Sequence, residues 1–384
     1  MKNRFYLLLL IFVFSGCNKI NSNNQFIEFI EITDNSSLKL SSFIEKIEYV
    51  ILPKDLILSR IDKVLEFNDL FIICDFDNLS KIFIYNSKNL KIYSIDNFGE
   101  GPGEYNYISD VTINEDLNTI DILSLNKILR FDLFGVFKEE IHLNSLLYKM
   151  MYIKDNNYIV YIPSNLHGDL LSNELSGSIL FNLDPDKNTY KRLLPYYFKN
   201  NMPFMSEVNI LQKFKDNFFF TMTFADTIYS FNMENFINKK YFLDFKTKRY
   251  PIELLYNNDD AISILNDKNN ISKYSYHYSN LHINEKYLIT NFRAKSNGVI
   301  VYNKESKEVF SGYDLINDID KGLNKFNIKL LRDNIAYSFD QPGYILEHFE
   351  KNGNNMTKNR NNFTEMASKV DAHTSLILSK YYLK

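Results

Sequence analysis

Charged side chains that follow predicted strands are the first candidates for chemistry. Asp75 and Asp77 come directly after an apolar run, and Asp226 and Arg293 occupy comparable positions later in the chain. If these strands line a common axis, the loops after them open on one face, where carboxylates and a guanidinium group can converge on a ligand. Asx residues beside turns also cap backbone N–H groups. We favour capping and keep these four residues as candidates for a ligand face.

Other familiar catalytic and metal-binding patterns are missing from the sequence. His277 and His282 are five residues apart, a spacing that does not align two side chains on a helix. Zinc needs three or four converging ligands, and the chain has only two cysteines. Ligands from different repeats can still meet in space, so spacing alone excludes nothing. We find no Gly-x-Ser-x-Gly, His-Glu-x-x-His or Walker pattern, and we expect no catalytic residues, metal or cofactor.

A glycine-rich segment at 98–105, FGEGPGEY, is either a phosphate cradle or a tight turn. A phosphate site needs a helix N-terminus directly after the glycines, but the next residues alternate like a strand. Glu100 and Glu104 would also repel phosphate. We therefore predict a structural connection in which proline and glycine set the backbone and the tyrosine packs. Its residues are Gly99, Gly101, Pro102, Gly103, Glu104 and Tyr105.

The N-terminus has the features of an export signal. Lys2 and Arg4 precede the apolar run 5–14, and two small residues then lead into Cys17. The run is about half the length needed to span a membrane as a helix. Residues 1–16 are therefore predicted to be a signal peptide.

Residues 14–17 resemble a bacterial lipobox, in which the cysteine is acylated and becomes the first residue of the mature protein. Phe14 departs from the usual leucine at that position, and the alternative is ordinary cleavage beside an incidental cysteine. We expect lipidation of Cys17, which would hold the protein on a membrane through its acyl chains. Residues 17–25, rich in Asn and Ser, are expected to be a flexible tether.

Charge gives no reason to expect a nucleic-acid partner. The chain has a net charge of −3, and loss of Lys2 and Arg4 with the signal makes the remainder more acidic. With Cys17 acylated, Cys74 has no disulfide partner, and we expect it to be a small buried hydrophobic residue.

A strand–loop–strand pattern recurs along the chain, in copies of about fifty residues. Aromatic and β-branched residues dominate each copy, which favours strands. The five complete copies place their strands at 69–74 and 81–86, 119–123 and 127–132, 157–161 and 178–182, 217–221 and 227–232, and 286–290 and 298–303. A sixth copy has strands at 334–339 and 375–383, separated by two helical stretches at 343–351 and 363–370.

These repeats predict an all-β, six-bladed β-propeller at residues 26–384, with a short helical insertion near the C-terminus. Segments 90–95, 136–143 and 239–245 supply third strands. The early strands 26–33 and 44–52 have no unit of their own, and we expect both to join the sheet of the C-terminal strand. Pairing of the two chain ends would close the ring without a free edge.

The chain resembles the six-bladed β-propeller lipoproteins of Bacteroidetes. The resemblance lies in the 98–105 loop, in DTIY at 226–229 and in VDAHTSLIL at 370–378, where the family usually has Asn-Pro in place of His373-Thr374. It implies a propeller related to the NHL type and an envelope location, without an established activity.

We therefore expect a lipid-anchored binding or scaffolding propeller that recognises a glycan, a peptide or an envelope protein. No acidic residues directly follow Cys17, which favours an outer-membrane protein facing the periplasm. Two alternatives stay open. One is a lyase or hydrolase with its site at the channel mouth, and the other is an accessory subunit of an outer-membrane uptake assembly.

Overall fold

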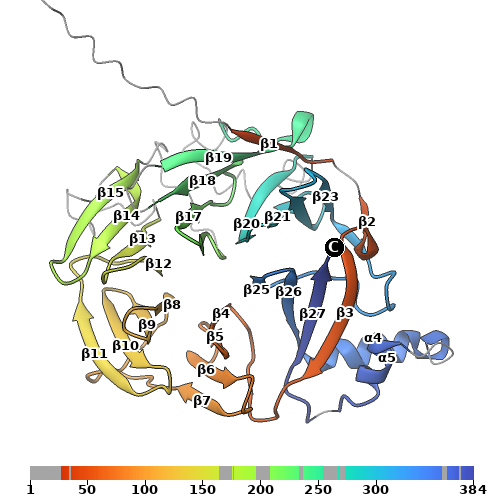
Figure 1. Ribbon diagram of the computed structural model, residues 1–384, viewed down its shortest axis with the longest axis horizontal. Coiled ribbons are helices and arrows are strands. Elements are labelled where there is room, and N and C mark those ends of the chain that lie inside the picture. Colours follow the sequence, from red (N-terminus) through yellow and green to blue (C-terminus); the bar gives the residue numbers. More distant parts are fainter. Residues whose placement is uncertain are drawn as a thin grey trace, which may run out of the picture.

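Six antiparallel sheets stand around a central axis and form a six-bladed β-propeller, confirming the predicted fold (Figure 1). In five blades the chain runs from the axis outwards to the rim. The computed structural model describes residues 27–33, 36–163, 175, 177–195, 208–232, 237–253, 267, 273–356, 361–371 and 373–384. The predicted signal peptide, Cys17 and the tether lie outside these residues.

The first three blades follow one another along the chain. Blade 1 contains β4 (Lys63–Phe67), β5 (Leu70–Asp75), β6 (Lys81–Asn86) and β7 (Ile92–Ile95). Blade 2 contains β8 (Asp110–Asn114), β9 (Thr119–Ser124), β10 (Lys127–Asp132) and β11 (Phe137–His142). Blade 3 contains β12 (Lys149–Tyr152), β13 (Tyr158–Tyr161), β14 (Ser178–Asp184) and β15 (Thr189–Pro195). The predicted strand pairs are the second and third strands of these blades.

The other three blades include strands from the start of the chain. Blade 4 contains β16 (Leu211–Phe214), β17 (Asn217–Phe220), β18 (Thr227–Phe231), β19 (Ile237–Asp244) and the added β1 (Glu28–Glu31). Blade 5 contains β20 (Tyr276–Ile283), β21 (Tyr287–Arg293), β22 (Asn297–Asn303) and β23 (Val309–Gly312). Blade 6 contains β25 (Leu330–Arg332), β26 (Ile335–Asp340), β27 (Ile377–Leu383) and β3 (Ile44–Ile51).

The two ends of the chain close the ring in blade 6. β3 pairs antiparallel with β27 from Ile377↔Ile51 to Leu383↔Ile44, so the predicted closure is confirmed. The earlier strand differs from expectation, because β1 pairs in parallel with β19 at the rim of blade 4. Between them, β2 (Ser37–Lys39) pairs with β24 (Asp314–Ile316). The N-terminal segment thus crosses the outside of blades 4 and 5 before it enters blade 6 (Figure 1).

Apolar contacts between neighbouring blades hold the ring together. Separate clusters of buried side chains fill the interfaces between blades 1 and 2, 2 and 3, 3 and 4, 4 and 5, 5 and 6, and 6 and 1. Both faces of each sheet are therefore buried, which explains the runs of Ile, Phe and Tyr in the sequence. Cys74 lies in the cluster between blades 1 and 2 as a buried free thiol, and burial raises its pKa.

A buried polar network also joins blade 2 to blade 3. The Nε of Arg130 lies 3.3 Å from Oδ2 of Asp121. Tyr158 of blade 3 donates a hydrogen bond to the same oxygen at 2.5 Å. Thr119 donates to Oδ1 of Asp121 at 2.7 Å. Neither member of the ion pair is more than 5% exposed, and Arg130 also pairs with Glu139 at 2.8 Å, so Arg130 is the buried cation on which the charge of Asp121 depends.

The helical insertion covers the outside of blade 6. It consists of α4 (Pro342–Met356) and α5 (Asn362–Ala367), close to the helical stretches expected from the sequence. Asn361 caps α5, since its side chain accepts the N–H of Thr364 at 2.9 Å. Phe363 and Ile377 belong to the small core beneath the helices, which fixes the insertion to the blade.

Candidate functional site

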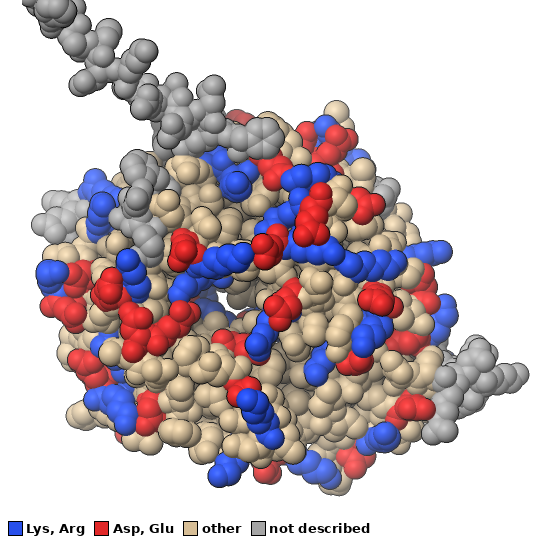
Figure 2. Space-filling view, in the orientation of Figure 1, with Lys and Arg blue, Asp and Glu red and all other residues tan. Residues whose placement is uncertain are grey.

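The innermost strands of the six blades line a channel along the axis. A cavity of about 150 Å³ opens where β4, β8, β12 and β16 begin. A second cavity, of about 590 Å³, continues along the inner strands and shares Lys63, Asn209 and Leu211 with the first. Figure 2 shows a hollow at the centre of the propeller, with side chains of both charges around it. We call the first cavity the channel mouth.

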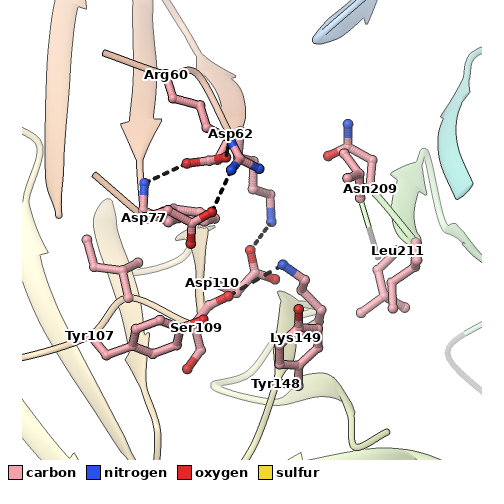
Figure 3. A pocket seen from close by; sticks show the side chains of 15 residues that line it. Arg60, Asp62, Asp77, Tyr107, Ser109, Asp110, Tyr148, Lys149, Asn209 and Leu211 are labelled. Atoms are coloured by element: carbon pink, nitrogen blue, oxygen red, sulfur yellow. Dashed lines mark hydrogen bonds and ion pairs between the residues drawn. The ribbon is translucent and has the colours of Figure 1, made fainter. Parts of the chain in front are cut away.

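One side of the channel mouth is built by Arg60, which holds two carboxylates. Its Nε lies 2.5 Å from Asp62 and its Nη1 lies 2.7 Å from Asp77. Asp62 also accepts the N–H of Phe76 at 2.8 Å, so the segment before β4 is tied to the loop after β5. Figure 3 shows this group across the cavity from Asn209 and Leu211. The side chains are thus positioned by the protein itself, as a preorganised site requires.

A second group lies deeper, where β4 and β8 begin. The ammonium of Lys63 lies 2.7 Å from Oδ1 of Asp110, and the Asp110 side chain is only 3% exposed. The same oxygen accepts the N–H of Val111 at 2.9 Å, and Oδ2 accepts the N–H of Met150 at 2.9 Å. One carboxylate therefore ties the starts of β4, β8 and β12 together.

The far wall of the channel supplies amide and imidazole groups. Asn209 donates to Oδ1 of Asn280 at 2.8 Å. His282 lies 3.0 Å from the same oxygen through its Nε2. Burial, aided by the charge of Lys329, lowers the pKa of His282 to about 3, so the ring is neutral near pH 7. The amides and the neutral imidazole of this wall can exchange hydrogen bonds with a ligand.

The structure does not bring together the four residues proposed from the sequence. Asp77 lies in the channel mouth, whereas Asp75 is buried and accepts N–H groups of Ser59, Arg60, Asn78 and Leu79. Burial works to raise the pKa of Asp75, but these hydrogen bonds outweigh it and the pKa is lowered. Asp75 is therefore a cap for two loop segments.

The other two of these residues belong to different blades. Asp226 forms an ion pair with Arg249, and burial nevertheless raises the pKa of Asp226 to about 6. Arg293 donates to Asn297 across the turn between β21 and β22. Among the described residues, no hydrogen bond or ion pair joins Asp75, Asp77, Asp226 and Arg293 across blades.

The glycine-rich loop lies between blades 1 and 2. Tyr105 is fully buried, and its hydroxyl lies 2.9 Å from the carbonyl of Ser80 and 3.2 Å from that of Ile95. Gly101 donates its N–H to Glu104 at 2.8 Å, and Gly103 donates to Glu140 at 3.0 Å. The protein's own carboxylates therefore take the N–H groups that a phosphate would need.

The buried histidines have structural neighbours. Nε2 of His277 lies 2.7 Å from the Thr290 hydroxyl and Nδ1 lies 2.9 Å from the Ala225 carbonyl, while burial lowers the pKa of His277 to about 4. Within the described part of the chain, no three His, Cys, Asp or Glu residues are placed to hold a metal ion. Across the same residues, no helix has the length and apolar character to cross a bilayer. His167 lies outside the described residues.

Sequence reasoning missed most of the channel mouth. Asp75 was expected to follow an inner strand, but β5 is the second strand from the axis. The innermost strand is the short β4, which opens with Lys63. Asp110 and Lys149 likewise open β8 and β12. In these three blades, a charged residue opening the strand before the repeat was the available signal.

Comparisons with known proteins agree with this architecture. A profile described as a domain of unknown function (DUF4934) matches residues 24–373. An exported protein from Bacteroides fragilis has 16% identity and a TM-score of 0.76, covering 93% of this chain and 99% of that one. A DUF4221 family member from Bacteroides vulgatus has 12% identity and a TM-score of 0.49, covering 89% and 97%. No curated protein matches the sequence. With most of its length matched by the profile, the chain belongs to the DUF4934 family of six-bladed propellers.

Proposed function

We propose that the protein is a lipid-anchored envelope protein of the NHL-like type that binds a glycan, peptide or protein partner at the channel mouth. The observation that carries this proposal is the mouth itself. Loops before β4, β8, β12 and β16 place charged groups, an amide and tyrosine rings around one opening. Such a mixture of apolar surface and fixed polar groups suits ligand recognition.

Binding without catalysis fits the local contacts better than a lyase or hydrolase does. The carboxylates of Asp62 and Asp110 are engaged by cations and backbone N–H groups. Asp226 and Arg293, which a shared catalytic site would need, engage separate partners. Membership of an uptake assembly is an outcome that co-purification from detergent-solubilised membranes would reveal.

Arrays of glycans and peptides, probed with the purified full chain, test the binding site. The variant Asn209→Ala removes an amide from the mouth, and Tyr148→Ala removes a ring that lines it. Both should weaken binding of any array ligand. Tyr344→Ala, on the exposed face of α4, is the matched control and should bind like wild type. Equal binding by all three variants would contradict a site at the mouth.

The proposed location in the cell envelope rests on the signal-like N-terminus and the lipobox resemblance. The Bacteroides fragilis neighbour is itself described as exported. Substituting Cys17→Ala should release the protein into the soluble fraction, because the acyl chains supply the membrane affinity. Immunoblots of membrane and soluble fractions give the readout. Full membrane retention of Cys17→Ala would refute lipid anchoring while leaving the binding proposal intact.

A further inference from the structure

Polar residues contributed by all six blades lie at the two joined cavities, and we call them the ring. Lys63, Asp110, Lys149, Asn209 and Lys329 line the cavities, and Asn280 accepts a hydrogen bond from Asn209. Three are lysines and one is an aspartate, so the ring carries more positive than negative charge. Low-dielectric walls strengthen the field inside such a channel. The ring therefore favours an anion.

Asp110 is already engaged by one lysine and two backbone N–H groups. Its Oδ1 takes the ammonium of Lys63 and the N–H of Val111, and its Oδ2 takes the N–H of Met150. The positive charge on the opposite side of the ring is therefore not balanced by this carboxylate.

Lys329 is the uncompensated charge. It directly precedes β25 and lines the deeper cavity. Among the described residues, its ammonium has no ion-pair or hydrogen-bond partner. Burial lowers the pKa of Lys329; the charge of Asp62 opposes this shift from a distance, and that of Arg60 adds to it. Asp62 is itself occupied by Arg60 at 2.5 Å and by the N–H of Phe76 at 2.8 Å.

The neighbours of Lys329 favour a small ligand with further polar groups. His282 is neutral and does not balance the charge. Asn209 donates a side-chain N–H to Asn280, while its side-chain Oδ1 has no partner among the described residues. The larger of the two joined cavities has a volume of about 590 Å³, within the range of small-molecule sites.

We infer that the channel binds the carboxylate group of a small acidic ligand, with the ammonium of Lys329 as its ion partner and the side-chain Oδ1 of Asn209 accepting a hydrogen bond from a neighbouring hydroxyl or amide. This inference rests on the proposed binding site at the mouth and names the chemistry that site selects. An acidic sugar and a free peptide C-terminus both present this group. A charge-assisted pair inside a channel discriminates strongly against an uncharged analogue.

Isothermal titration of the purified full chain separates these sources. The probes are galacturonate against galactose, and glycylglycine against its C-terminal amide. At least one acid should bind, and bind at least about tenfold more tightly than its neutral partner. A difference in affinity within the galacturonate and galactose pair identifies an acidic sugar as the source, and a difference within the glycylglycine pair identifies a peptide C-terminus. Absence of binding by both acids at millimolar concentration would overturn the inference, as would equal affinity within the pair that binds.

A variant series assigns the effect to Lys329. Lys329→Met should lose at least about tenfold in affinity for the acid, whereas Lys329→Arg should retain most of it. Lys88→Met, at a lysine whose side chain is 76% exposed in blade 1, is the control and should bind like wild type. Lys329→Met should unfold at the same or a higher urea concentration, because it removes an unpaired charge from the channel. An unchanged affinity of Lys329→Met for the acidic ligand would contradict the inference. Array ligands that still required Asn209 and Tyr148 would leave the proposed function standing.

Discussion

Replacing Arg130 by methionine should expose how strongly the blades depend on the buried polar network between blades 2 and 3. Arg130 lies 3.3 Å from Asp121, and their side chains are 5% and 0% exposed. Methionine fills much of the same volume but leaves Asp121 without its buried cation. Breaking one partner of a buried ion pair costs about 3–5 kcal/mol of stability. The hydrogen bonds from Thr119 and Tyr158 to Asp121 remain and favour the lower end of that range.

The loss should depend on pH in a defined direction. Burial already raises the pKa of Asp121 in the wild type, and removal of Arg130 raises that pKa further. A carboxyl group with a raised folded-state pKa binds more protons when folded, so stability falls as pH rises above its unfolded pKa of about 3.9. Arg130→Met should therefore be closest to wild type near about pH 4 and fall further behind towards neutral pH.

Urea unfolding of the wild type and variants at several pH values provides the measurement. Lys138→Met is the matched control, because Lys138 pairs with Asp132 at the surface of blade 2 and should contribute at most about 1 kcal/mol. The double variant Asp121→Leu/Arg130→Met should recover much of the loss, since no buried charge remains. A loss in Arg130→Met no larger than that in Lys138→Met would refute the reasoning.

Three further variants test other parts of the structure by urea unfolding. Tyr105→Phe should lower the free energy of unfolding by about 1 kcal/mol, because it removes a buried, hydrogen-bonded hydroxyl. Tyr107→Phe, at a ring that is 37% exposed, should change it little. Equal losses in the two variants would contradict this. Gly103→Ala should destabilise the protein by about 1 kcal/mol or more, because φ is +75° and a Cβ would meet a phenyl ring at 2.9 Å. Gly343→Ala, at a helical position with open space around it, should be neutral or stabilising. A larger loss in Gly343→Ala than in Gly103→Ala would contradict the geometry of the loop. Because the folded-state pKa of Asp226 is raised to about 6, wild-type stability should fall as pH rises from about 4 to 6, and Asp226→Asn should reduce that fall. An unchanged pH profile in Asp226→Asn would refute this.

The fold could be predicted because the buried strands of each blade form a repeating apolar pattern in the sequence. The second and third strands of most blades are buried on both faces, and their apolar runs, such as Leu70–Asp75 and Lys81–Asn86, stand out in the sequence. Closure by β3 and β27 followed from the unpaired strands at the two ends of the chain. The position of β1 did not follow, because a four-residue strand with alternating exposure fits the edge of any blade.

The channel mouth was harder to predict because most of the innermost strands are short and only β4, β8 and β12 open with a charged residue. β25 has only three residues, and β4 has one buried side chain. Their role depends on which strand lies nearest the axis, and that is set by contacts between blades. Asp77 was found because it follows an apolar strand, while Lys149 and Lys329 have no such marker in the sequence.

Hydrogen–deuterium exchange of the full chain, with and without the strongest ligand from the arrays, tests the central claim most directly. Ligand at the channel mouth should slow exchange in the segments 107–110, 148–150 and 208–211, which come from three different blades. Exchange in the rim strand β15 and in α4 should stay unchanged. Protection confined to the rim or to α4 and α5 would contradict a binding site on the propeller axis.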